Sequence, residues 1–525
     1  YMQWAVEKCG ALGIITDFMR PLEQIRTRYD LLDALNYTSF WWKYTQKEGK
    51  AFGFVLSPRE GDALAELCLK MREEHAKDAS KDTCPKVSCY VSSSIYDGAI
   101  ENVETVLKGE TDEEILIVAH LCHPRASAND NASGVAAGME VVKVLRDLTD
   151  SRKLPPLKRT VRVLFVPEFT GTYAFLDELG NGKQKILAGI NLDMVGGRQT
   201  TGYGPIMLVG LPRAMPSFLT DLAALILDEV KSDIPSNGIS RGNEAGIPLF
   251  NSQVMNFSGG SDHLVLSDPA IAIPTLMLGQ FPDLNYHTSA DTLDKVDPFI
   301  LCKSASLAAA YVYALSNLGI ADLPLIFNKS RERLVSALAW LNSNALEGAL
   351  KTDALYEEAE QLKRFAVKSC DDYRRFFSGP ELEKADTLIK EEQTHIESIF
   401  SLFLSRYLKD SDSEGFTYVR PETPPQYACV PVRKFVSPIQ HLEDYALNDE
   451  RLFAAFSAYD KGSRSKFNSS HQAEAIIQYY MDGKRTVFEI ARELWFEDHD
   501  GSPEIVCDYL RLLELYGLVE LKPGA

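Results

Sequence analysis

Residues 119–134, which read AHLCHPRASANDNASG, gather side chains that could do chemistry. The segment contains His120, His123 and Asp130, and it lies between an apolar run at 115–118 and an amphipathic run at 135–148. Imidazole nitrogens beside a carboxylate are the ligand mixture that suits zinc and similar divalent metals. The alternative is a strand-to-helix turn whose polar residues only cap the helix. The segment therefore predicts a metal site or, failing that, a polar turn.

Alternating strands and helices must position this segment. We expect strands at 87–94, 115–119, 161–166, 188–192, 206–209 and 271–278, with helices such as 216–230 between them and a closing helix over 298–318. Strands that alternate with helices predict a largely parallel sheet with helices on both faces. In such sheets, ligands and catalytic groups gather at the carboxyl ends of the strands.

Further polar side chains follow other strands of this predicted sheet. Glu168 follows the strand at 161–166, Asp193 follows the strand at 188–192, and His287 comes after the last strand. Any one of them alone is more often a helix cap or a hydrogen-bonded polar residue. Several strand ends that supply metal-ligand side chains are much less expected by chance, so together they favour a metal site.

The composition narrows the class of protein. The chain has 525 residues, enough for about three domains, and its 45% hydrophobic and 25% charged residues are typical of a soluble globular protein. Nine scattered cysteines lack disulfide spacing and favour the cytoplasm. A net charge of −19 opposes nucleic-acid and anionic-membrane binding. No apolar stretch looks long enough to span a bilayer and no signal-like segment opens the chain, although a start at Tyr1 predicts that an N-terminal segment is missing.

The order of these motifs resembles the co-catalytic zinc exopeptidases related to bacterial leucyl aminopeptidase and the transferrin-receptor ectodomain. The CysHisPro and AsnAspAsn elements bring it nearest to the bacterial aminopeptidase-like subgroup, and the likeness covers residues 87–318. The run at 101–109 is similar to the strand that leads into this peptidase core. Residues 1–86 resemble, more weakly, part of a protease-associated domain. The resemblance implies zinc, as one or two ions, with other divalent metals compatible.

Carried over by residue, the family pattern implies that Asp130 bridges two metals, with Asp193 on one and His287 on the other. The family usually has His-x-Asp where this chain has His120-Leu121-Cys122, so His120, His123 or both are candidate ligands, and the CysHisPro element favours His123. The family commonly has two adjacent glutamates, but this chain has only Glu168. Glu168 is therefore either a metal ligand or the general base.

The implied reaction is metal-assisted removal of N-terminal residues from a peptide substrate. Glu168 would carry a proton from the metal-activated water to the leaving amine, and Tyr286 would hydrogen-bond the developing oxyanion. Asp262 and His263 are expected to hold the ligand side chains in position without binding the metal themselves. The alternative is a non-catalytic descendant that binds a peptide or protein, and related amide chemistry is also compatible with the fold.

The predicted fold class is α/β, with a mostly parallel mixed sheet covered by helices on both faces. Its domains are a partial protease-associated-like module at 1–86, the exopeptidase-like core at 87–320, a helical segment at 321–415 and a winged-helix-like domain at 416–525. In the helical segment, a stripe for packing is expected from Leu334, Leu338, Trp340 and Leu341.

The last domain resembles a winged helix, with an Asp482-Gly483 turn and Thr486 before two helices. Residues 471–525 contain five Lys and Arg but eleven Asp and Glu, which opposes DNA binding. We therefore expect this domain to contact another protein or to gate access of the substrate. A homo-oligomer is also compatible with the sequence.

Overall fold

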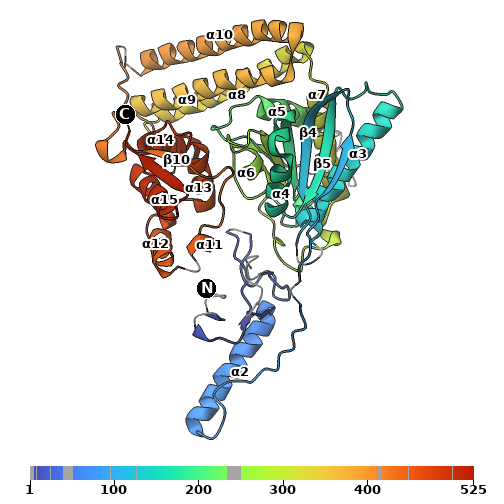
Figure 1. The fold of residues 1–525 in the computed structure, drawn as a ribbon, viewed down its shortest axis with the longest axis vertical. Coiled ribbons are helices and arrows are strands. Elements are labelled where there is room, and N and C mark those ends of the chain that lie inside the picture. The colour runs from blue at the N-terminus through green and yellow to red at the C-terminus, as the bar shows by residue number, and fades with distance from the viewer. Residues whose placement is uncertain are drawn as a thin grey trace, which may run out of the picture.

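The computed structural model describes residues 5–524 except for 7–8, 24, 39–50, 95, 124, 126, 233–249, 412, 414, 447–448 and 499. Figure 1 shows a central sheet flanked by helices, a layer of long helices at one end, a C-terminal bundle beside the sheet and an N-terminal arm. The sequence also predicts a helix over 2–10, and part of that range lies outside the described residues.

Seven strands form the central mixed sheet in the order β3-β5-β4-β6-β9-β7-β8. Their bounds are β3 (Val103–Leu107), β4 (Thr111–His120), β5 (Arg159–Val166), β6 (Ile186–Asp193), β7 (Ile206–Val209), β8 (Ser252–Met255) and β9 (Thr275–Gln280). Strands β5, β4, β6 and β9 are parallel, whereas β3 and β7 run antiparallel to their partners β5 and β9. The α/β prediction is confirmed as a mixed sheet with a parallel centre.

Alternate side chains of β4 enter two different helical layers. Ile115 and Ile117 share a core with α3 (Gly134–Asp150), α5 (Leu219–Ser232) and α7 (Pro298–Ser316). Leu116 and Val118 pack on the other face with α4 (Thr170–Leu179) and α6 (His263–Leu266). Because successive side chains of a strand point to opposite faces, a strand covered on both faces is apolar throughout. The continuous apolar run at 115–118 reflects this burial.

Helix α7 is long and apolar enough to cross a membrane by length and composition alone. This corrects the expectation that no segment reaches that length. Its buried side chains, among them Leu307, Tyr311 and Leu315, belong to the core that contains the central sheet, and the helix contacts α3 and α5. In this fold α7 is a core helix.

Three long helices form a layer at one end of the molecule (Figure 1). They are α8 (Leu323–Leu346), α9 (Thr352–Asp371) and α10 (Gly379–Asp410). Leu334, Leu338 and Leu341 are buried as expected, but Trp340 is 62% exposed, so the packing stripe does not include the tryptophan. The helical segment expected after the sheet is otherwise confirmed.

In its described residues, the C-terminal segment has five α-helices, two short 3-10 helices and a two-stranded antiparallel ribbon. The α-helices are α11 (Glu443–Ala446), α12 (Glu450–Lys461), α13 (Ser470–Tyr479), α14 (Val487–Asp498) and α15 (Pro503–Leu515), and the ribbon pairs β10 (Val430–Arg433) with β11 (Val519–Lys522). Its apolar core also includes Phe257 and Leu264 from the sheet domain. The winged-helix assignment stays a prediction, as do the domain boundaries.

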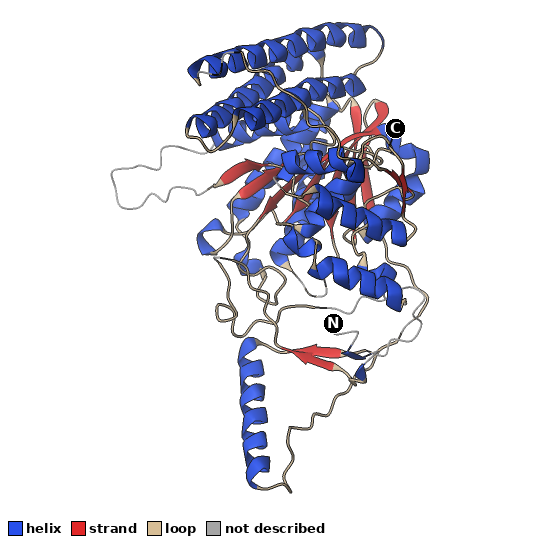
Figure 2. Ribbon diagram, turned by 90° about the vertical axis from the view of Figure 1, so that its left-hand side faces the viewer, coloured by secondary structure: helices blue, strands red, loops and turns tan. Residues whose placement is uncertain are grey.

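The N-terminal module pairs β1 (Ile14–Thr16) with β2 (Gly53–Val55) in parallel and continues into α2 (Pro58–Lys77). Ser57 and Glu60 form a capping box that fixes the start of α2. In Figure 2 this helix extends away from the body of the molecule. The strand expected at 87–94 is wrong, because these residues are exposed and have no strand assignment. Their sequence is suited to a strand, but a strand requires a hydrogen-bonded neighbour.

Candidate active site

The carboxyl ends of β4 and β6 bring two predicted ligands together. His120 ends β4 and Asp193 ends β6, and both side chains are buried. His120 Nε2 lies 3.2 Å from Asp193 Oδ1 and 3.3 Å from Asp130 Oδ1. Although burial disfavours a charged imidazole, the two carboxylates raise the pKa of His120 well above its usual value. Two carboxylates therefore converge on one imidazole nitrogen at the edge where α/β sheets bind ligands.

Asp130 is the centre of this cluster, and its residue is only 2% exposed. His123 Nε2 lies 2.8 Å from Asp130 Oδ1, and His287 Nε2 lies 3.3 Å from Asp130 Oδ2. Oδ2 is buried and makes no hydrogen bond of good geometry among the described residues. Although burial opposes the carboxylate, contacts with His120, His123 and His287 hold the pKa of Asp130 well below its usual range.

These side chains fit a divalent cation. Three imidazoles surround one buried carboxylate, a second carboxylate is adjacent, and a carboxylate oxygen is left without a good hydrogen bond. Nitrogen and oxygen ligands of this kind suit zinc, and a buried anion without a compensating partner is costly. One ligand atom each from His120, His123 and Asp130 lies within 4.8 Å of the others.

The loop that carries Asp130 is held by backbone hydrogen bonds. Asp291 accepts the N–H groups of Asn129 and Asp130, while Asn131 Oδ1 accepts those of Gly134 and Met194. The side chain of Asn129 also accepts the N–H of Gly196 at 3.0 Å and donates to Asp283 at 3.1 Å. These contacts account for both flanking asparagines as structural residues, as the polar-turn interpretation expects. The side chain of Asp130 contacts histidines instead, so that interpretation does not account for it.

Gly134 follows the same loop at a point of close approach. A Cβ atom there would lie 2.2 Å from the carbonyl oxygen of Leu192 and 2.4 Å from Asn131 Oδ1. Only glycine allows α3 to begin this close to the end of β6. The SerGly pair of the motif therefore sets the distance between the Asp130 loop and Asp193.

His120 and His123, which the sequence left as alternatives, both contact Asp130 Oδ1. Cys122 lies beside His120, with its Sγ 3.6 Å from His120 Nδ1. The same sulfur accepts the backbone N–H of Glu168 at 3.2 Å. A thiol is a weak hydrogen-bonding group, so His120 has a weaker orienting partner than a carboxylate would provide.

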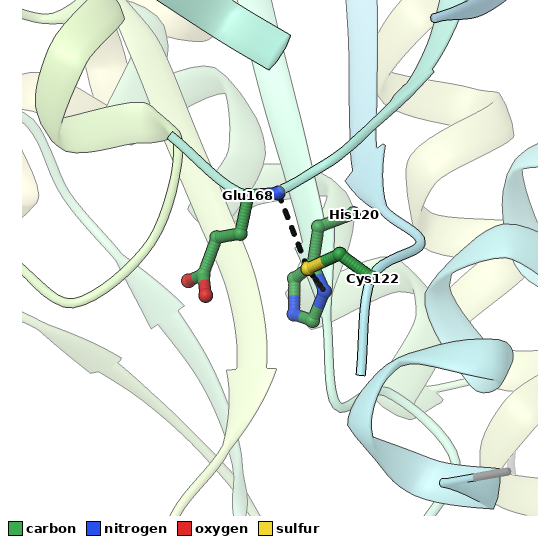
Figure 3. A group of neighbouring side chains, drawn as sticks. All are labelled: His120, Cys122 and Glu168. Carbon is green, nitrogen blue, oxygen red and sulfur yellow. Dashed lines mark hydrogen bonds between the residues drawn. The ribbon is translucent and has the colours of Figure 1, made fainter. Parts of the chain in front are cut away.

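Glu168 lies next to this pair, directly after β5. Figure 3 shows His120, Cys122 and Glu168 together, and one ligand atom from each lies within 4.8 Å of the others. Burial raises the pKa of Glu168 well above its usual value, the carboxylates of Asp193, Asp262 and Asp130 raise it further, and His120 opposes them. A carboxyl group with a raised pKa in such a site is a candidate general base.

Phe169 directly follows Glu168 in the chain. Its φ of 56° is in the left-handed region, which is unusual for a bulky residue. Its N–H donates to Asp262 Oδ1 at 2.8 Å, and Thr172 Oγ1 donates to the same oxygen at 2.7 Å. Asp262 thus holds the strained turn that carries Glu168. Burial raises the pKa of Asp262 to about 6.

His263 is fully buried, and its Nε2 lies 2.7 Å from the carbonyl oxygen of Ser258. Burial lowers its pKa to about 4, so the ring is neutral at pH 7. Its ring packs against Phe257, which belongs to the core of the C-terminal segment. This contact fits a structural role for His263 behind the site.

Two tyrosines contact His287. Tyr286 stacks on it with ring centroids 3.7 Å apart, and burial raises the pKa of Tyr286, which keeps the phenol protonated. Tyr37 is the second, with ring centroids 4.3 Å apart and its hydroxyl 3.2 Å from His123 Nε2. No motif in the sequence points to Tyr37, because this residue belongs to the N-terminal module and lies far along the chain from every predicted ligand.

The chain is similar to a family of unknown function and to a curated bacterial protein. A family model described as a domain of unknown function, DUF4910, matches residues 2–206. A curated Clostridium acetobutylicum protein, whose description links it to polysaccharide biosynthesis and gives it an aminopeptidase-like domain, is 28% identical over 229 residues. The match covers 43% of this chain and 46% of that protein, so the chain spans less than half of its curated relative.

Solved structures with similar folds include zinc aminopeptidases and related peptidases. The zinc aminopeptidase BSAP of Bacillus subtilis is 18% identical, with 40% of this chain and 49% of that chain covered and a TM-score of 0.32. A peptidase M28 precursor of Shewanella amazonensis is 20% identical, with 60% and 62% covered and a TM-score of 0.36.

Proposed function

We propose that this chain is a metal-dependent aminopeptidase that removes N-terminal residues from peptides. The observation that carries the proposal is the buried Asp130 carboxylate, which His120, His123 and His287 surround at the carboxyl edge of the sheet. The order of motifs in the sequence and the aminopeptidase-like domain named for the curated relative support the same class.

The cluster offers ligands for one or two zinc ions. His120 and Asp193 would hold the first with Asp130, and His123 and His287 would hold the second with the same carboxylate. Such an ion supplies a water of lowered pKa and polarises the scissile carbonyl. Other divalent metals would also fit nitrogen and oxygen ligands.

With His123 in the ligand set, Glu168 is free to act as the general base. Its carboxylate would take the proton of the attacking water and deliver it to the leaving amine nitrogen. Burial and the neighbouring carboxylates raise its pKa and so strengthen Glu168 as the acceptor of the water proton. The protonated phenol of Tyr286 would donate to the developing oxyanion. Asp262 would keep Glu168 in place through Phe169 and Thr172.

A peptide substrate, a cytoplasmic location and the lack of nucleic-acid or membrane partners are part of this proposal. The peptide substrate follows from the proposed reaction, and the scattered cysteines favour the cytoplasm. The net charge of −19 opposes nucleic-acid and anionic-membrane binding. The five Lys and Arg against eleven Asp and Glu in residues 471–525 support a protein-contact or gating role for the C-terminal segment.

Glu168→Gln tests the proposal most simply. The amide keeps the shape of the side chain but cannot accept the proton, so kcat should fall by about 10²–10⁴-fold. The measurement is hydrolysis of a panel of aminoacyl-anilides with added zinc, alongside metal content by mass spectrometry. Glu140→Gln, an exposed residue of α3, is the matched control and should match the wild type.

Each outcome has a distinct meaning. A Glu168→Gln variant that keeps its metal and loses turnover supports the role of Glu168 as the general base. Loss of the metal instead would make Glu168 a ligand, and full turnover would remove it from the mechanism. A wild-type protein with neither bound metal nor hydrolysis would contradict the enzyme and leave the non-catalytic binding protein.

A further inference from the structure

A short N-terminal segment packs directly on the loop that carries His287. The backbone N–H of Tyr37 donates to the carbonyl oxygen of His287 at 3.0 Å, and Asn36 forms an antiparallel bridge with Thr288. Leu35 and Ser289 exchange two more hydrogen bonds, at 2.8 and 2.9 Å. The N-terminal module is thus attached to a loop that carries a predicted ligand.

Arg26 fixes the same loop from the other side of the segment. Its residue is 2% exposed, and its Nη1 donates to the carbonyl oxygens of Leu284 at 3.0 Å and Tyr286 at 2.7 Å. A buried guanidinium that donates to backbone carbonyls on both sides of a residue restricts the loop between them. The backbone from Leu284 to Tyr286, directly before His287, is therefore held by a side chain of another module.

Tyr37 completes the contact by reaching the third histidine. Its hydroxyl lies 3.2 Å from both ring nitrogens of His123, whose Nε2 is also 2.8 Å from Asp130 Oδ1. If Nε2 is directed at a metal beside Asp130, then Nδ1 carries the proton and needs an acceptor. The Tyr37 oxygen is at hydrogen-bonding distance for that role. Histidines that bind metal almost always donate their second N–H in this way.

We propose that Tyr37 is a positioning residue that orients His123 toward the metal, so that the N-terminal module completes the active site. The inference rests on the proposed function, because it takes His123 as a ligand. It also fits a peculiarity of this chain. The carboxylate that would orient His120 is replaced by the Cys122 thiol, and the stronger oxygen partner is found at His123 instead.

Tyr37→Phe tests this inference, because it removes the hydroxyl and keeps the ring beside His287. Loss of an orienting partner of this kind typically weakens metal affinity by about 10–100-fold. We expect that loss in a competition titration of the full chain with Zn²⁺ and a chromogenic chelator. With Co²⁺ as the probe, the visible absorption bands should shift, because the geometry of the His123 ligand changes.

Tyr29→Phe is the control, since Tyr29 belongs to the same module and is 70% exposed. It should leave both the affinity and the Co²⁺ spectrum as in the wild type. Without metal, both variants should unfold at the temperature of the metal-free wild type. A Tyr37→Phe protein with wild-type affinity and spectrum would overturn the inference, as would equal losses in both variants. A wild type that binds no metal would instead overturn the proposed function.

Discussion

We expect Asp130→Asn to abolish tight metal binding and to lower kcat/KM on aminoacyl-anilides by about a thousandfold. Asparagine has nearly the same volume, but it has no charge and only one acceptor oxygen for the histidines that now contact Asp130 Oδ1 and Oδ2. A metal ion contributes several kcal/mol of transition-state stabilisation, and each 1.36 kcal/mol is a factor of ten in rate. Metal content and kcat/KM measured on the same preparation check the prediction.

Asp147→Asn provides the matched control, because Asp147 is exposed on α3, the helix that follows the Asp130 loop. It should retain the metal and the activity of the wild type. If Asp130→Asn also retained both, Asp130 would not be a metal ligand, and the polar-turn interpretation of its loop would be favoured.

Arg433→Met is expected to have the largest effect on folding stability. Arg433 forms a two-bonded ion pair with Asp268, at 3.1 Å and 2.5 Å, and the side chains of the pair are 8% and 0% exposed. Burial raises the pKa of Asp268, and Arg433 opposes that shift. Removing one partner of a buried pair leaves an uncompensated charge and costs about 3–5 kcal/mol. Urea unfolding at pH 7 measures the loss in the free energy of unfolding.

Arg406→Met is the control for charge removal at a surface. Arg406 pairs with Asp410 on α10 at 2.9 Å, with its side chain 73% exposed. Exposed pairs of this kind contribute less than about 1 kcal/mol. Equal losses for the two variants would mean that the Arg433 pair does not hold the C-terminal segment in place.

The position of this ion pair matters for the role of the C-terminal segment. Asp268 follows α6 closely, and the Tyr479 hydroxyl donates to the carbonyl oxygen of Leu264 in that helix at 2.5 Å. Asp262, which holds the Glu168 turn, directly precedes α6. The C-terminal segment therefore packs against α6, the helix that follows Asp262, and Asp262 in turn holds the turn that carries Glu168. Deletion of residues 415–525 would expose the apolar side chains of Leu264 and Phe257, which pack in the core of that segment. Single substitutions such as Arg433→Met keep this core covered, so they are the better test of a gating role.

The strands that position the site could be predicted because they are buried on both faces. The apolar runs at 115–118, 161–166 and 188–192 each lie inside a strand of the sheet. The predicted strand at 271–278 starts at Thr275, since Pro274 has no N–H for a ladder hydrogen bond. The short, partly exposed β8 has no such apolar run and was missed. The strand predicted at 87–94 is wrong for the opposite reason. These residues have a composition suited to a strand, but no neighbouring strand pairs with them.

The ligand cluster could be predicted from the sequence because its members follow the ends of predicted strands. The contacts of His120, His123, Asp130, Asp193 and His287 agree with that expectation, while their roles as ligands stay predictions. Tyr37 and Arg26 could not be found this way. They reach the site through packing of one module on another, with a separation of more than 250 residues between Arg26 and its acceptors.

The central claim is that a metal ion binds at Asp130, and anomalous diffraction at the zinc edge from crystals soaked in Zn²⁺ tests it most directly. We predict one or two peaks at about 2.0–2.2 Å from the Asp130 carboxylate oxygens and the nearby histidine nitrogens. Crystals that contain zinc elsewhere, or none, with no peak beside Asp130 would contradict the account.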